Sequence, residues 1–598
     1  MYAGAENFLT LITNMENREI ARILSEIGEY LDMQEVPFKP RAYEKAANAI
    51  AELEEGVVEI YKKDGLKGLE NIPGVGASIA EKIEELIKTG RLRYYEDLKK
   101  DTPVKLDELT RVEGLGPKNI KKLHEKLGVK NLDDLEKAAK AHKIRGLEDF
   151  GEKSEENILA GITFLRMHGT RFILGNVMPL AEKLKERLEK VPGTSKVTIA
   201  GSYRRRKETI GDLDILVVAK NSKQVMDYFV NQQEVDRVLA QGPTKSSIRL
   251  GSGIDVDLRV VPAESYGAAL AYFTGSKAHN VHMREIAQKK GMKLNEYSLS
   301  KASPGAGRPR GDKIIAGKSE EEIYKALGLA YVEPEMREDL GEVELAISNT
   351  LPKIIQYGAL LGDLQTQTDW TDGKDSIEIM AKAAIRAGLK YIAITDHTKR
   401  LAMTNGLDEK RLKKQAVEID KVNKKLNGKI KVLKGSECDI LKDGTLDLSD
   451  EVLKALDVVG ISVHSQFNLT RGDQTARITR AMENPNADIL FHPTGRLINK
   501  RKAYDVDMEE VIKTAKRTGT ILEINALPER SDLADEYIRK CVDSGVKMSI
   551  DSDAHSVNHF GYLDLGVAQA RRGWATKADI INAWPLDKCL NFLKNDKS

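Results

Sequence analysis

The stretch that most constrains the fold is a turn at Gly201–Asp214, which joins two apolar, strand-like runs at residues 197–200 and 215–218. Asp212 and Asp214 stand two positions apart at the start of the second run, so both side chains point to the same face of a strand. Two carboxylates held this close need cations between them. Oxygen ligands suit Mg²⁺ or Mn²⁺, and Mg²⁺ keeps part of its shell for substrate phosphates. The pattern therefore predicts a divalent-metal site at the beginning of a strand.

The rest of the turn and a later strand add partners for such a site. Gly201 and Ser202 offer a tight turn with a hydroxyl and free backbone N–H groups, and Arg205 offers a fork that matches a phosphate. A third carboxylate, Asp257, lies in a further strand-like run at residues 254–261. Taken singly, an Asp-x-Asp pair or a run of basic residues is usually a solvated surface feature. Together, three carboxylates and a phosphate-binding turn indicate phosphoryl or nucleotidyl transfer with two metal ions.

These residues resemble the fingerprint of the family X DNA polymerases, which is Gly-Ser-aromatic-Arg-Arg followed by Gly-Asp-x-Asp. The match continues in Asp257-Leu258-Arg259, Tyr272-Phe273-Thr274-Gly275-Ser276, Asn280, Met283-Arg284 and Asn295-Glu296-Tyr297. The resemblance implies that Asp212, Asp214 and Asp257 are catalytic and hold two Mg²⁺ ions. It also implies that a deoxynucleoside triphosphate is bound by Ser202, Arg205, Gly211, Tyr272, Phe273, Gly275 and Asn280, and the template side by Arg284. Asp257 would further activate the primer 3′-hydroxyl as a metal ligand and proton acceptor.

Length, charge and cysteine content bound the other possibilities. A chain of 598 residues predicts several domains. Lys and Arg number 94 against 92 Asp and Glu, so any nucleic-acid footprint must be local. The three cysteines show no paired spacing, which argues against a disulfide framework and suits a reducing compartment. No apolar run is long enough to span a membrane, and we expect a cytoplasmic monomer with no membrane partner.

Residues 1–160 read as an all-α domain that contains an internal repeat. The hairpin with Gly74 and Gly76 opens a helix, and the hairpin with Gly114 and Gly116 repeats the pattern. Glycines let a backbone approach a phosphate, and free N–H groups at a helix start point at it. The pair resembles helix-hairpin-helix motifs, which bind DNA backbones without reading sequence. A degenerate third copy is suggested at residues 146–156, where an aspartate, Asp149, stands in place of a glycine.

The same region resembles the small lyase-type domain of family X polymerases. In that family a lysine after the first hairpin attacks an abasic sugar, and Lys82 occupies the matching position. Lys39 and Tyr43 match positions near the 5′-phosphate of the DNA. The alternative is that Lys82 is an ordinary solvated lysine beside Glu81, because composition alone favours that reading. A family lysine one turn earlier is replaced by Ser78, which weakens the case for lyase chemistry.

The middle of the chain carries the expected polymerase core. Residues 161–334 form an α+β nucleotidyltransferase palm with a thumb, and residues 335–358 form a linker. We expect a helix at residues 222–240, strands within 246–261 and a loop at 303–311.

Residues 359–598 change character, because strand-like runs alternate with helical stretches. That alternation predicts an α/β barrel with parallel strands, whose functional residues follow the strands. Ligand-type residues stand at such positions: Asp396-His397, Glu437, His464, His492, Asp553 and His555. Four histidines with Glu437 and Asp553 have the composition of a metal cluster, although a single such histidine is usually structural.

This half resembles the polymerase-and-histidinol-phosphatase (PHP) domain that follows many prokaryotic family X polymerases. In the family the domain holds three metals and removes 3′ nucleotides. The resemblance implies one Zn²⁺ or Mn²⁺ site at Asp372, His397 and His555, and a second at Glu437, His464 and His492. The third would join Glu437 and Asp553 to two histidines that are replaced here by Gln365 and Gln367. An amide oxygen is a poorer ligand than imidazole for these ions, so we expect weak or absent 3′–5′ exonuclease activity.

Three functions remain open from sequence alone. The first is a template-directed DNA polymerase that fills short gaps in gapped or nicked DNA, which the intact carboxylate trio favours. The second is a PHP-type phosphoesterase or nuclease that the other domains target to DNA. The third is a DNA-binding scaffold without surviving chemistry.

Overall fold

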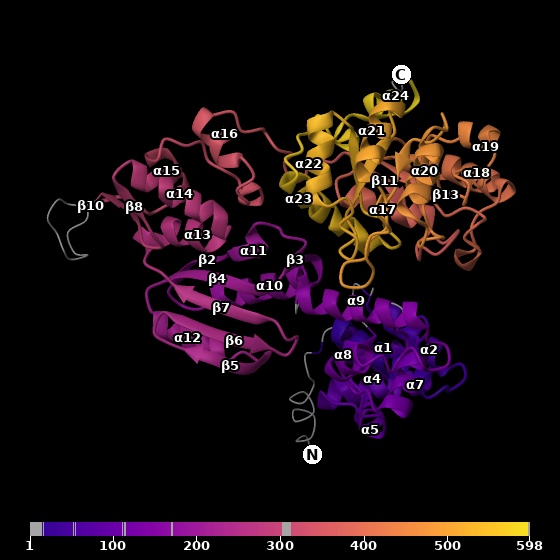
Figure 1. Cartoon of the computed structure of the whole chain (residues 1–598), viewed down its shortest axis with the longest axis horizontal. Coiled ribbons are helices and arrows are strands. Elements are labelled where there is room, and N and C mark those ends of the chain that lie inside the picture. The colour runs from indigo at the N-terminus through magenta and orange to yellow at the C-terminus, as the bar shows by residue number, and fades with distance from the viewer. Residues whose placement is uncertain are drawn as a thin grey trace, which may run out of the picture. The chain divides into compact units, whose positions relative to one another are not determined.

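The computed structural model describes residues 15, 17–51, 53, 56–110, 112, 115–168, 171–301 and 313–595. The chain divides into two compact units, the first comprising residues 1–169 and the second nearly all of the remainder (Figure 1). Gly114 and the loop expected at 303–311 lie outside the described residues. The domain limits at residues 160, 334 and 358 remain a proposal.

The first unit is all-helical. Helix α1 buries Ile20, Leu24, Ile27 and Leu31 along one face, as the spacing of its apolar residues predicts. The helices are α1 (Asn17–Met33), α2 (Lys39–Ala51), α3 (Val57–Glu70), α4 (Ala77–Thr89), α5 (Arg93–Asp101), α6 (Leu106–Leu109), α7 (Pro117–Leu127), α8 (Leu132–Lys140) and α9 (Glu152–His168).

Each of the hairpin turns before α4, α7 and α9 contains a backbone hydrogen bond of the same kind, from the N–H of one residue to the carbonyl of the residue three positions earlier. The bonds are Val75 N to Ile72 O (2.9 Å), Leu115 N to Val112 O (3.0 Å) and Phe150 N to Leu147 O (3.1 Å). In the first turn Gly74 has a φ of +85°, and in the third Asp149 takes the same left-handed conformation with a φ of +71°. The third hairpin therefore has the turn of the first, although its sequence lacks the glycine.

The palm in the second unit is a five-stranded sheet in the order β2-β4-β7-β6-β5. Its strands are β2 (Thr194–Ile199), β4 (Asp212–Ala219), β5 (Val235–Gln241), β6 (Lys245–Leu250) and β7 (Asp255–Val260), joined by the short elements β1 (Phe172–Ile173), α11 (Gly201–Arg204) and β3 (Thr209–Ile210). Helices α10 (Leu174–Glu189) and α12 (Ser222–Val230) pack on the sheet. The helix expected at 222–240 was wrong beyond Val230, because residues 235–241 pair with β6 as an edge strand.

The thumb combines helices with a small antiparallel sheet in the order β10-β9-β8. Its elements are α13 (Tyr266–Thr274), α14 (Lys277–Lys289), β8 (Met292–Leu294), β9 (Leu299–Lys301), β10 (Lys313–Ala316) and α15 (Glu320–Ala326), followed by α16 (Glu342–Ser348). The Ser319 hydroxyl accepts a hydrogen bond from the Glu322 N–H at 3.3 Å and so caps the start of α15.

The C-terminal domain is a parallel sheet of seven strands in sequence order, as the alternation predicts. The strands are β11 (Gly362–Thr366), β12 (Tyr391–Ile394), β13 (Lys431–Asp439), β14 (Val458–Ser462), β15 (Ile489–Leu490), β16 (Ile521–Asn525) and β17 (Met548–Asp551). A bridge between Thr366 and Ala554 brings the first strand to the last, so the barrel is nearly closed. The helices are α17 (Ile377–Arg386), α18 (Glu409–Leu426), α19 (Asp450–Lys454), α20 (Arg471–Met482), α21 (Met508–Thr518), α22 (Asp535–Ser544), α23 (Leu563–Arg572) and α24 (Leu586–Asn595).

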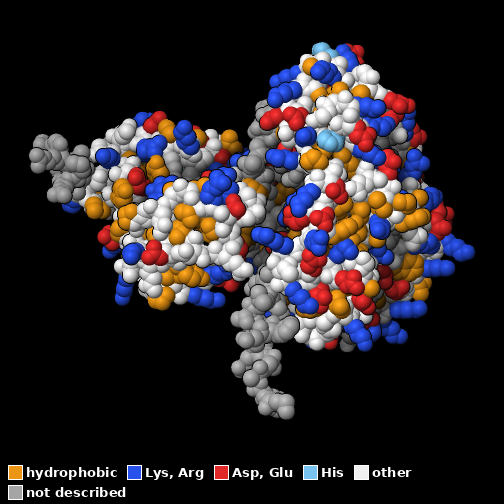
Figure 2. Space-filling model, turned by 90° about the horizontal axis from the view of Figure 1, so that it is seen from below, with side chains coloured by type: hydrophobic (Ala, Val, Ile, Leu, Met, Phe, Trp, Pro, Cys, Tyr) orange, Lys and Arg blue, Asp and Glu red, His pale blue; other side chains and the backbone are white. Residues whose placement is uncertain are grey.

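Charged side chains of both signs are spread over the visible surface (Figure 2). Figure 2 shows Lys and Arg side chains mixed with Asp and Glu over the visible face, rather than gathered into separate halves. Within the described ranges, no helix combines the length and apolar character needed to cross a membrane.

Candidate active sites

The register of two palm strands determines where the polymerase carboxylates lie. Strands β4 and β7 pair in parallel, with Asp214 opposite Asp257 and Asp212 opposite Asp255. Directly opposite residues on neighbouring strands project their side chains to the same face of a sheet. The register therefore places Asp212, Asp214 and Asp257 on one face at the beginning of both strands.

Burial and the neighbouring negative charges act most strongly on Asp214. Burial, followed by the negative charges of Asp212 and Asp257, raises the pKa of Asp214 to about 7. Such a set of oxygen ligands fits divalent cations, which remove the repulsion when they bind. Lys245 of β6 contacts Asp257 at 2.8 Å, an ion pair that sequence reasoning missed because its two members lie on different strands.

The turn after β2 approaches these carboxylates closely. Gly201 has a φ of +60°, and a Cβ placed there would lie 2.3 Å from Oδ2 of Asp214. Glycine is therefore required both by the backbone conformation and by the carboxylate beside it. Ser202 lies in α11 on the same turn, and Gly211 directly precedes β4.

Arg205 is engaged by the protein itself. Its Nε donates to Glu338 at 3.1 Å, and its Nη1 donates to the backbone carbonyl of Thr274. The neighbouring Arg204 forms a bidentate ion pair with Glu320, at 2.6 and 2.9 Å, and this pair was not predicted. Through these contacts the turn is joined to the thumb, at Thr274 and Glu320, and to Glu338 in the segment that follows the thumb.

The structure brings two of the predicted nucleotide contacts and the predicted template contact into one hollow of the thumb. Tyr272, Asn280 and Arg284 line it, and the Asn280 amide donates to the Tyr272 carbonyl at 2.7 Å. Phe273 lies outside the lining, with the Arg259 guanidinium 4.6 Å from its ring centre. Gly275 also lies outside, at the end of α13 with a φ of +74°.

The lyase-type residues of the first unit lie near one another. Partial burial lowers the pKa of Lys82, and the nearby charge of Lys39 adds to the effect. The Lys82 ammonium lies 4.9 Å from the ring centre of Tyr94 and donates to the Ser78 hydroxyl at 3.1 Å. Tyr43 is buried, and its burial, with a smaller contribution from Tyr94, raises the pKa of its hydroxyl. The sequence analysis did not single out Tyr94.

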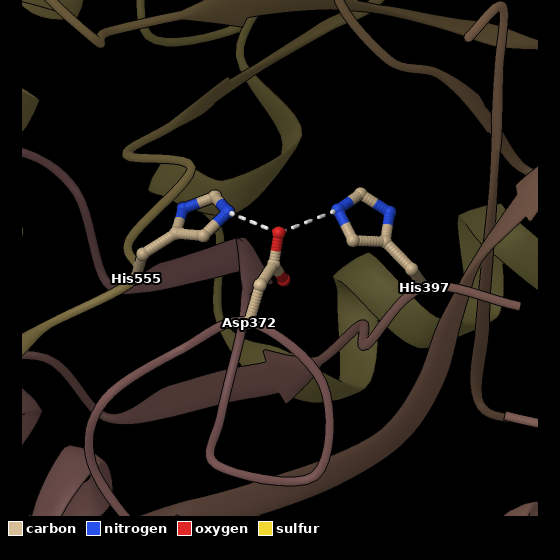
Figure 3. Close-up of side chains that lie close together, drawn as sticks. All are labelled: Asp372, His397 and His555. Carbon is tan, nitrogen blue, oxygen red and sulfur yellow. Dashed lines mark ion pairs between the residues drawn. The ribbon is translucent and has the colours of Figure 1, made fainter. Parts of the chain in front are cut away.

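In the barrel, the first predicted metal set is assembled. Figure 3 shows the Asp372 carboxylate between the rings of His397 and His555. Its Oδ2 lies 3.6 Å from Nε2 of His397 and 3.8 Å from Nε2 of His555. Among the described residues, two groups bring three ligand atoms within 4.8 Å of one another, and this is one of them.

The second set gathers on Glu437, which is fully buried. Its Oε1 lies 2.9 Å from Nε2 of His492 and 3.0 Å from Nε2 of His464. The second of the two close groups consists of His397, Glu437 and His464. Burial alone would raise the pKa of Glu437, but the charge of His397 and the hydrogen bonds of His464 and His492 hold it well below its usual range. Oxygen and imidazole donors in this arrangement suit Zn²⁺ or Mn²⁺.

Gln365 and Gln367 present hydrogen-bond donors where the third set needs ligands. Their Nε2 atoms donate to Oε2 of Glu437 at 3.2 and 2.7 Å. Oε1 of the Gln365 side chain accepts a hydrogen bond from the Asn525 side chain at 3.2 Å, while Oε1 of Gln367 is buried without a partner in the protein. Both glutamines therefore donate hydrogen bonds to the Glu437 oxygen that a third ion would need as a ligand.

The remaining member of this set, Asp553, is also held by neutral and basic groups. Asn525 donates to its Oδ2 at 3.2 Å, and Arg530 lies 3.3 Å from the same atom. Asp439 lies 3.2 Å from Nδ1 of His464, and a carboxylate there orients the ring. Sequence reasoning missed all three neighbours, although the spacing of Glu437 and Asp439 along β13 resembles the Asp-x-Asp pattern of the palm.

Comparisons with known proteins agree with this architecture. Family models match a helix-hairpin-helix domain at residues 15–92, a SAM-like helix-hairpin-helix tandem at 106–162, the DNA polymerase beta palm at 175–248, the DNA polymerase beta thumb at 269–338 and a PHP domain at 363–542. The DNA polymerase/3′-5′ exonuclease PolX of Bacillus subtilis is 37% identical over 97% of this chain and 100% of its own length. This chain belongs to the prokaryotic family X DNA polymerases with a C-terminal PHP domain. It is a DNA-directed DNA polymerase.

Two further relatives match about half of this chain. The DNA polymerase lambda of Rattus norvegicus is 27% identical over 54% of this chain and 56% of its own length. The DNA polymerase lambda of Arabidopsis thaliana is 27% identical over 54% of this chain and 62% of its own length.

Proposed function

We propose that this family X DNA polymerase fills short gaps in duplex DNA, with Mg²⁺ or Mn²⁺ at Asp212, Asp214 and Asp257. The observation that supports this most directly is the cluster of Lys39, Tyr43, Lys82 and Tyr94, which joins basic and aromatic side chains on a unit built of backbone-binding hairpins. A polymerase that holds the 5′ end of a gap in this way needs no long template contact. The hairpin glycines Gly74, Gly76 and Gly116 are exposed and can approach DNA phosphates.

The proposed chemistry divides between the palm and the thumb. Divalent ions supply charge neutralisation on the triphosphate and lower the pKa of the primer hydroxyl. Asp212 and Asp214 hold the triphosphate side, and Asp257 faces the primer hydroxyl as metal ligand and proton acceptor. Ser202, Gly211 and Arg205 bind phosphate oxygens, whereas Tyr272, Asn280 and Arg284 contact the sugar, the base and the template in the thumb hollow.

Gap filling is tested by primer extension on three DNAs that differ only downstream of the primer. We expect the fastest extension across a short gap with a 5′-phosphate, slower extension across the same gap with a 5′-hydroxyl, and the slowest on an open template. Lys39→Ala should remove the advantage of the 5′-phosphate, since Lys39 is exposed beside Lys82. Equal rates on all three DNAs would exclude the gap-filling proposal.

The lyase proposal predicts a covalent adduct at Lys82. A lysine with a lowered pKa is a better nucleophile at neutral pH, so borohydride should trap the wild-type protein on an abasic site with a 5′-phosphate. We expect Lys82→Ala to reduce trapping at least about tenfold. Lys88→Ala is the matched control, because Lys88 lies on the same helix but pairs with Glu84 on the exposed surface. A wild-type protein that forms no adduct would end the lyase proposal.

We also propose that the PHP domain is a weak 3′–5′ exonuclease at most. Support comes from Gln365 and Gln367, whose amide groups donate to Glu437. The name of the Bacillus subtilis relative includes a 3′-5′ exonuclease, and the intact Asp372, His397 and His555 group favours a residual Zn²⁺- or Mn²⁺-dependent phosphoesterase as the second candidate function. Metal analysis of the purified protein separates these alternatives from an entirely metal-free barrel.

A further inference from the structure

The palm and the PHP domain meet in a tightly packed contact within the second unit. At Gly175 of α10, an added Cβ would lie 2.7 Å from Leu565 of α23 and 2.8 Å from Pro528. Leu565 packs against the apolar core of the palm. Side-chain bulk at Gly175 is thus excluded by residues of the other domain, so the two surfaces are in direct contact.

At this contact, Arg572 at the end of α23 reaches the phosphate-binding turn, which we define as residues 201–211. Its Nη1 donates to the backbone carbonyl of Arg205 at 2.9 Å and to Glu338 at 3.1 Å, and its Nη2 pairs with Asp535. The Arg572 side chain is only 2% exposed. A buried guanidinium that holds three acceptors in a fixed fork is a rigid support for the carbonyl among them.

Glu338 joins this support to the side chain of Arg205. Its Oε1 accepts from Nε of Arg205 at 3.1 Å and lies 3.5 Å from Nζ of Lys207. Three cationic side chains, those of Arg205, Lys207 and Arg572, therefore share one carboxylate. A positive charge from the PHP domain thus faces the same carboxylate as two positive charges of the turn.

A second contact holds the other end of the turn. Arg496, which follows β15 in the PHP domain, pairs with both oxygens of Glu208 at 2.6 and 3.3 Å. Gln569 of α23 donates to the same carboxylate at 3.3 Å. The turn is therefore fixed at residues 205 and 208 by side chains that lie 288 to 367 residues later in the chain.

We propose that Arg572 and Arg496 of the PHP domain are positioning residues for nucleotide binding by the polymerase. They act through the turn, because a turn that is already ordered loses less conformational freedom when it closes on a triphosphate. The inference rests on the proposed role of the turn in binding that triphosphate. It assigns the PHP domain a role in polymerisation that needs no metal in the barrel.

The test is steady-state primer extension by the full-length protein at saturating DNA, with dNTP varied. Arg572→Met and Glu208→Gln should each raise the KM for dNTP about tenfold, the effect of losing a charged hydrogen bond, while kcat changes less than about threefold. Arg572→Lys keeps one donor near the Arg205 carbonyl and should recover part of the loss. The affinity for inorganic tripolyphosphate, measured by calorimetry, should fall in parallel, whereas the affinity for DNA should not change.

Glu234→Gln is the matched control for a merely structural ion pair. Glu234 forms a bidentate pair with Arg187 in the palm, at 2.6 and 2.8 Å, away from the turn. If Arg572→Met and Glu208→Gln leave KM within twofold of this control, the inference is wrong. Ser202→Ala separates phosphate binding by the turn from the positioning of the turn by Arg572. An unchanged tripolyphosphate affinity in that variant refutes the proposed role of the turn itself. A loss of affinity in that variant, without any effect of Arg572→Met, refutes only the positioning role.

Discussion

Replacing Asp257 with asparagine is expected to slow primer extension at least about a thousandfold, the largest effect of any single substitution considered for this protein. Asp257 stands opposite Asp214 in the parallel register of β4 and β7, so its carboxylate completes the cation site that the other two aspartates begin. Asparagine keeps the size of the side chain but removes the charge and the proton acceptor. Single-turnover extension of a primer in excess protein measures the rate of the chemical step directly.

Asp255→Asn is the control for this experiment. Asp255 lies on the same strand and the same face two residues earlier, but its carboxylate forms a bidentate pair with Arg249 at 2.7 and 2.9 Å. We expect this variant to retain activity within about fivefold, because exposed ion pairs contribute little. Comparable losses in the two variants would show that charge on the strand, rather than the position of Asp257, sustains activity.

The double substitution Gln365→His with Gln367→His is expected to raise 3′–5′ degradation of a primer about a hundredfold. Each change removes an N–H donor from Glu437 and offers an imidazole nitrogen in its place. The neighbouring groups are already present, since His464 and His492 contact the other oxygen of Glu437. Release of nucleotides from a labelled primer in the presence of Mn²⁺ measures the gain.

Two further variants make that result specific. Adding Asp553→Asn to the double variant should abolish the gain, because Asp553 is the remaining ligand of the rebuilt set. Gln415→His places a histidine at another buried glutamine of the barrel, one that donates to Asp396 instead of Glu437, and should have no effect. Vigorous degradation by the unmodified protein, lost on Glu437→Gln, would contradict the proposal that the glutamines weaken the domain.

The parts of the fold that follow from local patterns were predicted from sequence. The helical first unit, the palm strands that flank the Gly201 turn and the parallel barrel all follow from apolar periodicity and turn residues. Residues 235–240 were assigned to a helix, because the pairing of β5 with β6 is not a local property. Strand β11 (Gly362–Thr366) was missed for a similar reason, since it is a strand only through its pairing with β12 on one side and the bridge to Ala554 on the other.

Side chains that act across domains could not be found in the sequence. Glu338, Arg496 and Arg572 carry no motif, and only the folded chain brings them to the phosphate-binding turn. Lys245 likewise reaches Asp257 from a neighbouring strand. By contrast, the residues of the polymerase and PHP motifs were identified from their resemblance to those families and from their positions beside predicted strands.

The central claim, that Asp212, Asp214 and Asp257 bind the catalytic ions, is tested most directly by counting bound Mn²⁺. Electron paramagnetic resonance of Mn²⁺ titrated into the full-length protein with a non-hydrolysable dNTP reports bound and free ion. We predict that a variant with all three aspartates changed to asparagine binds two fewer ions than the wild type, while the ions held by the barrel remain. An unchanged number of bound ions in that variant would contradict the account.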